Sequence, residues 1–81
     1  MAQAAGLASI HERLRDDAAA TYHEWRLACE WIERADADWR VARRGERRLA
    51  HAALVAALDR EERAAEAHRE AVLRKAARLR A

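Results

Sequence analysis

The stretch WRVARRGERRLAHAAL, residues 39–54, decides the fold, because the pattern of apolar residues changes phase within it. Before it, mostly apolar side chains recur at alternating spacings of three and four residues from Ala4 to Ala42, the heptad pattern of one helix face. Beyond it that register falls on charged residues, whereas a register displaced by two residues stays largely apolar as far as Leu79. Gly45 lies in the middle of the interval, and glycine commonly follows a helix because it accepts a left-handed conformation. The pattern therefore predicts a hairpin turn near Gly45.

Two stripes of side chains are expected to face each other across this hairpin. The first helix contributes Ala4, Leu7, His11, Leu14, Ala18, Thr21, Trp25, Ala28, Ile32, Ala35, Trp39 and Ala42. The second helix contributes His51, Leu54, Leu58, Glu61, Ala65, His68, Val72, Lys75 and Leu79. With a turn near Gly45, Trp25 comes opposite Ala64 and Ala65, so large side chains face small ones, as close packing requires.

Composition agrees with an all-α protein. The chain of 81 residues contains 23 alanines and no proline, and only six of its residues are β-branched, so helices are favoured and a sheet is not. We interpret it as a single domain, an antiparallel two-helix hairpin that resembles a coiled coil. The first helix is expected at about residues 4–43 and the second at about residues 47–80.

Other boundaries are compatible with the same sequence. Ser9 and Glu12 match a capping box, so a regular helix could begin only at Ser9. A break at residues 36–38 would let Asp38 cap a new helix. A third arrangement is one uninterrupted helix, in which the phase change is a stutter.

The expected core is thin, which favours association with another chain. Alanine supplies 23 of the 42 apolar residues and buries little area per side chain. A two-helix protein of this size usually gains stability from another chain. Four large residues fall outside the facing stripes and are predicted to lie in a protein interface: Leu27, Trp31, Val55 and Leu73. The expected partner is a second copy, giving a homodimeric four-helix bundle, or a larger assembly that the chain serves as adaptor, small subunit, chaperone or regulator.

Charge is unevenly distributed and supports an alternative function. Residues 39–48 hold five arginines and one glutamate, although the net charge of the whole chain is only +2. These arginines either complement the negative end of the first helix or bind an anionic partner, with nucleic acid as the alternative ligand. The bodies of the helices are acidic and would repel a phosphate backbone, so we rank nucleic acid second. The candidate anion-binding residues are Arg40, Arg43, Arg44, Arg47 and Arg48.

Catalytic, metal and cofactor sites are not expected. Di-iron helical bundles carry a glutamate three residues before a histidine, and none of His11, His23, His51 and His68 is preceded in this way. The single Cys29 has no activating group near it in sequence, and the chain has neither a glycine-rich phosphate loop nor a nucleophile elbow. We therefore expect a protein that is not an enzyme, has no cofactor or metal, does not enter a membrane and resides in the cytoplasm.

Overall fold

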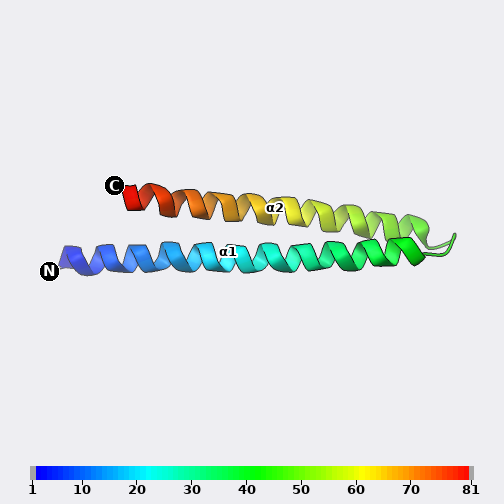
Figure 1. Ribbon diagram of the computed structural model, residues 1–81, viewed down its shortest axis with the longest axis horizontal. Helices are drawn as coiled ribbons and strands as arrows, with labels where there is room; N and C mark the ends of the chain where they lie inside the picture. The colour runs from blue at the N-terminus through cyan, green and yellow to red at the C-terminus, as the bar shows by residue number, and fades with distance from the viewer. Residues whose placement is uncertain (1, 81) are drawn as a thin grey trace.

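The chain folds into two long α-helices joined by a short turn. The computed structural model describes the backbone of residues 2–80 and the side chains of residue 6 and residues 8–80. Helix α1 spans Ala2–Val41 and helix α2 spans Arg47–Arg80, with no strand in the described part of the chain. The helices lie antiparallel and side by side (Figure 1). The predicted all-α hairpin with its turn near Gly45 is confirmed. A break at residues 36–38 and an uninterrupted helix are both wrong.

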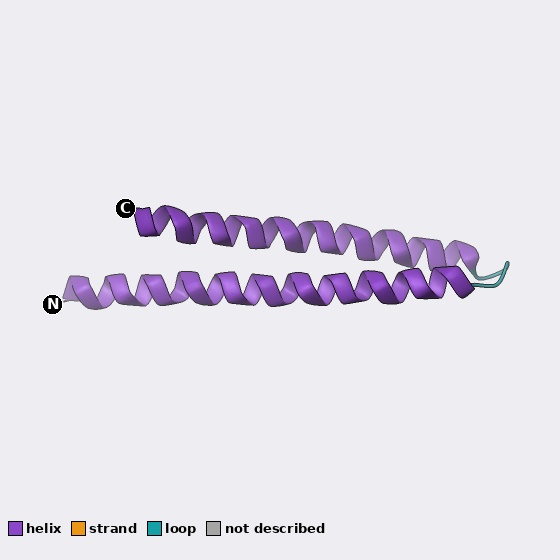
Figure 2. Cartoon of the chain, viewed as in Figure 1, coloured by secondary structure: helices purple, strands orange, loops and turns teal. Residues whose placement is uncertain are grey.

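The turn comprises residues 42–46 and is drawn in teal in Figure 2. The backbone N–H of Glu46 donates to the carbonyl oxygen of Arg43 at 2.8 Å, and the N–H of Ala50 donates to the carbonyl oxygen of Glu46 at 3.0 Å. Gly45 has no positive φ, and a Cβ added to it would meet no atom within 4 Å. The place predicted for the turn is right but the reason is wrong, because this turn needs no left-handed glycine.

The capping box at Ser9 is also wrong. Helix α1 already includes Ser9, so Ser9 is an interior helical residue rather than the residue that begins the helix. The residues from Ala2 to Ala8 are mostly alanine, the strongest helix former, and this propensity carries the helix past the signal.

The facing stripe predicted for α1 agrees with the structure where side chains are described. From Leu14 to Ala42, every residue of that stripe is buried or half-buried: Leu14, Ala18, Thr21, Trp25, Ala28, Ile32, Ala35, Trp39 and Ala42. His11 is the exception and is exposed. Ala4 and Leu7 lie outside the described side chains.

The stripe predicted for α2 is half right. Leu54, Glu61, Ala65, His68 and Lys75 are half-buried, as expected, and Ala64 beside Ala65 is half-buried too. Two other positions are displaced by one residue, because Ala57 and Ala71 are buried while Leu58 and Val72 are exposed. The small side chains of Ala57 and Ala71 allow the two helices to approach each other closely at these positions. The observed seam of α2 is Ala50, Leu54, Ala57, Glu61, Ala64, His68, Ala71 and Lys75.

The hairpin is long and only one layer thick. Its dimensions are 66 × 15 × 12 Å, so no side chain is far from solvent. The buried hydrophobic residues of the described chain are alanines alone, namely Ala18, Ala28, Ala57 and Ala71. None of the larger apolar side chains of the described residues is fully buried, and this leaves the two sides of the hairpin as the places where a binding site can form.

Candidate protein-binding surfaces

A polar and aromatic cluster holds the middle of the hairpin together. The indole Nε1 of Trp25 donates a hydrogen bond to Oε1 of Glu61 at 2.8 Å. The Trp25 ring also stacks on His68, with 6.1 Å between ring centroids and 11° between planes. Oγ1 of Thr21 lies 3.0 Å from Nδ1 of His68, and the ring of Tyr22 packs against the same histidine at 5.6 Å. These five residues form contacts within the hairpin, so they act as structural residues of the seam.

Trp31 lies on one side of the hairpin, over a shallow groove. The groove has a volume of about 330 Å³ and is floored by Ala53, Ala56 and Ala57 of α2. The guanidinium groups of Arg34 and Arg60 lie 5.0 and 5.9 Å from the centre of the Trp31 ring, within the range of a cation–π interaction. The indole remains 46% exposed. We call this the Trp31 side of the hairpin.

The four residues predicted to form an interface do not share one surface. Leu27 is half-buried and, four residues before Trp31, lies on the Trp31 side. Val55 lies on the opposite side. Each residue turns the helix by about 100°, so a residue just after a seam residue and a residue just before one lie on opposite sides of the seam. Val55 follows the seam residue Leu54, whereas the groove residues Ala53 and Ala56 each precede a seam residue.

Leu73, the fourth predicted residue, points away from α1 altogether. It follows the buried Ala71 by two residues, which is about 200° of helix rotation, and it is 56% exposed. The predicted set is therefore divided among three directions around the hairpin.

A longer apolar stripe, not recognised from the sequence, runs along the side of α2 opposite Trp31. We call it the lateral stripe. Its members are His51, Val55, Leu58, Glu62, Ala65, Arg69, Val72, Ala76 and Leu79. Each follows one seam residue of α2, except Leu79, which follows Arg78, the exposed residue that continues the spacing of the seam beyond Lys75. Leu58, Val72 and Leu79 are 47%, 42% and 69% exposed. The sequence pattern contained this signal, but it assigned these three residues to the contact with α1.

The five arginines near the turn are all exposed, and two of them also contact neighbouring side chains of the same chain. Nε of Arg40 lies 3.0 Å from Oδ2 of Asp36, one turn earlier in α1. The guanidinium of Arg47 lies 4.2 Å from the centre of the Trp39 ring, and that ring also packs against His51 at 5.2 Å. The remaining three arginines, Arg43, Arg44 and Arg48, are exposed.

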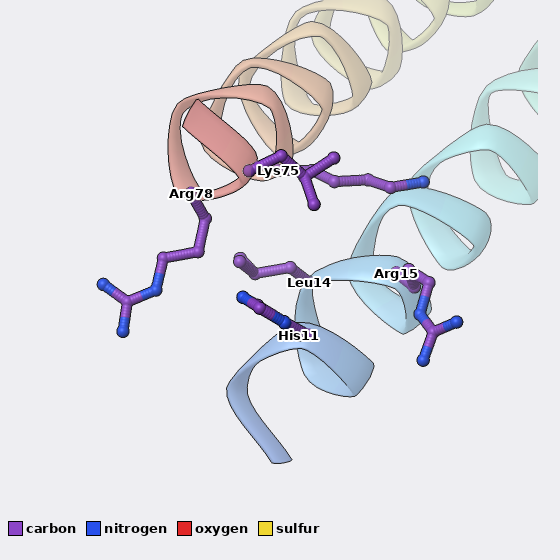
Figure 3. A pocket seen from close by; sticks show the side chains of 6 residues that line it. His11, Leu14, Arg15, Lys75 and Arg78 are labelled. Carbon is purple, nitrogen blue, oxygen red and sulfur yellow. The ribbon is translucent and has the colours of Figure 1, made fainter. Parts of the chain in front are cut away.

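A second basic group lies at the open end of the hairpin (Figure 3). His11, Leu14 and Arg15 of α1 and Lys75, Arg78 and Leu79 of α2 surround a space of about 300 Å³. In Figure 3 the guanidinium groups of Arg15 and Arg78 extend away from the centre of the group in different directions. These cations do not converge on a common point where a ligand would be held.

The described residues offer few other chemical features. Within the described part of the chain, no three His, Cys, Asp or Glu side chains lie close enough to hold a metal ion. Cys29 is a half-buried free thiol. Neither described helix contains an 18-residue stretch apolar enough to cross a bilayer. Comparison with known protein families, with curated proteins and with solved structures found no match for this chain.

Proposed function

We propose that this chain is a noncatalytic interaction protein, a helical hairpin whose function is performed in association with another protein chain. The observation that supports this most strongly is that its small apolar side chains are buried while many of its large ones are exposed. Its buried hydrophobic side chains are alanines, while nine large apolar side chains in the described part are exposed: Tyr22, Trp31, Val41, Leu49, Val55, Leu58, Val72, Leu73 and Leu79.

The free energy of burial explains why such a surface favours a partner. Fully burying a leucine, valine or similar side chain stabilises a protein by about 1.5–3 kcal/mol. The isolated hairpin gains only part of this from its large residues, and a chain of this size has little other core. Association with another chain would cover these side chains and complete the apolar core.

A protein partner fits the arginines near the turn better than nucleic acid does. Arg40 is already paired with Asp36, and Arg47 is packed on Trp39, so two of the five cations have neighbours within the chain. Residues 1–38 hold eight acidic and four basic residues, which disfavours a long contact with a phosphate backbone. Binding of RNA or DNA that weakens steeply with salt and with replacement of Arg43, Arg44 and Arg48 by alanine would favour the alternative function.

The proposal is tested by the mass and the stability of the purified chain. Light scattering after gel filtration is expected to give a multiple of the 9.2 kDa chain mass. The unfolding midpoint should rise between about 1 and about 100 µM protein, because association stabilises by mass action. A monomer that unfolds cooperatively, with high stability and at a midpoint independent of concentration, would contradict the proposal. A monomer that is only marginally folded would be compatible with a different protein partner.

A further inference from the structure

We infer that the chain covering the hairpin is a second copy of itself, bound antiparallel along the lateral stripe of α2. This inference rests on the proposed function, and it specifies both the partner and the surface. The lateral stripe is about 100° around α2 from the seam with α1, since each member up to Ala76 follows a seam residue by one position. A second hairpin placed there would complete a square of four helices, the arrangement of a four-helix bundle.

The lateral stripe is complementary to itself when it is reversed. A two-fold axis beside Ala65 places the α2 helices of the two copies antiparallel. A residue of one copy then lies opposite a residue of the second copy when their two residue numbers add to 130 or 131. Leu58 then faces Val72 of the second copy, and Val55 faces Ala76 of the second copy. Ala65 faces itself, and its small side chain allows the two helices to approach closely at the axis. Leu58, Val55 and Val72 would thus be covered in apolar pairs, while Leu79 would face the imidazole of His51 of the second copy.

The charges of the stripe are complementary in the same alignment. Glu62 and Arg69 lie three and four residues from Ala65 on its two sides, so Glu62 comes opposite Arg69 of the second copy and the reverse contact repeats it. Both side chains are exposed. Within the hairpin, Arg69 is held only loosely, with its Nη1 3.9 Å from Oε2 of Glu66. Each of these opposite-charge contacts would occur twice in a symmetric dimer.

Helix α1 supports the same alignment. The rotation that pairs the two α2 helices also places α1 beside α1 of the second copy. The register of the hairpin is given by Trp39 against His51 and Tyr22 against His68, whose numbers both add to 90. With that register, Arg15 comes beside Asp36 of the second copy, a pair of opposite charges that occurs twice, whereas one like-charge contact, Arg26 beside Arg26 of the second copy, occurs once at the axis.

The Trp31 side is less suited to a second copy. On that side α2 presents Arg60, Arg63 and Arg74, each of which precedes a seam residue. The same face of α2 carries one acidic residue, Glu70, so its net charge is +2, and two copies of this surface in contact would bring together more like charges than opposite charges. The two sides therefore differ in a way that an experiment can detect.

Disulfide formation at the two-fold axis tests the alignment. The variant carries Cys29→Ser, which removes the single native cysteine, together with Ala65→Cys. Before oxidation, light scattering must show the same oligomeric state for this variant as for the wild type. Diamide is expected to link most of this variant into a dimer, because residue 65 faces itself. The matched control is Ala67→Cys in the same background, an exposed position near the same level of α2 but on the Trp31 side, where little linkage is expected. Linkage of the Ala67→Cys variant in place of the Ala65→Cys variant would overturn the inference.

Charge reversal provides a second measurement that does not depend on a new thiol. Glu62→Arg and Arg69→Glu are each expected to weaken dimerisation about tenfold in sedimentation equilibrium, since each creates two like-charge contacts. The double variant should regain most of the wild-type affinity, whereas Arg63→Glu should change it little. If neither charge reversal changes the affinity of the dimer, the lateral stripe is not its interface, although the proposed function still holds. A marginally folded monomer would overturn the second copy as partner, and a stable monomer would contradict both proposals.

Discussion

The indole of Trp25 donates a hydrogen bond to the carboxylate of Glu61 across the hairpin, at 2.8 Å between Nε1 and Oε1. Both side chains are half-buried, and each stands at the centre of the seam of its own helix. The bond joins an apolar residue to an acidic residue in a contact that consists otherwise largely of alanine, so it sets the register of α1 against α2 as well as stabilising it.

Removal of this hydrogen bond is expected to destabilise the hairpin. Trp25→Phe keeps an aromatic ring but leaves Glu61 without its donor, and the free energy of unfolding should fall by about 1–2 kcal/mol. Urea unfolding followed by circular dichroism, at one protein concentration, measures the change. Glu61→Gln keeps an acceptor and should lose less. In a double-mutant cycle with Glu61→Ala, strictly additive effects would show that the bond contributes nothing.

The close approach of the helices at Ala71 predicts a strong dependence on side-chain size. Ala71 is 1% exposed, so Ala71→Leu must push α2 away from α1, and we expect a loss of about 1–3 kcal/mol in unfolding free energy. The matched control is Ala52→Leu, an exposed alanine of the same helix, which should change stability by less than about 0.5 kcal/mol. Equal effects of the two variants in thermal or urea unfolding would disprove the predicted tight contact.

The turn predicts a stabilising substitution. Gly45 has neither a positive φ nor an atom near its missing Cβ, so Gly45→Ala should raise the free energy of unfolding by about 0.4–1 kcal/mol by restricting the unfolded chain. Glu46→Pro serves as the contrast, because it removes the N–H that donates to Arg43 and should destabilise the hairpin. A loss of stability in Gly45→Ala, measured by the same unfolding experiment, would mean that the turn does require glycine.

The two helices differ in how well the sequence pattern predicted the face that each one buries. In α1 the large residues Leu14, Trp25, Ile32 and Trp39 recur at heptad spacing with smaller residues between them, so a single stripe could be chosen and the structure agrees with it. In α2 large residues stand directly beside alanines, as Leu58 does beside Ala57. Two adjacent stripes therefore satisfy the same periodicity, and the predicted stripe took its members from both, with Leu58 and Val72 wrongly assigned to the seam.

Composition and periodicity by themselves determined that this chain is helical and that its apolar pattern changes phase near Gly45, because alanine content and a phase change are local properties of the chain. Only the tertiary structure decided which side of α2 meets α1. That choice depends on contacts between residues that are distant in sequence. Trp25 and Trp39 pack between the helices, Trp25 donates its hydrogen bond to Glu61, and the small side chains of Ala57 and Ala71 allow the helices to approach. Those contacts turned Leu58 and Val72 outward and so created the lateral stripe, on which the inferred contact with a second copy depends.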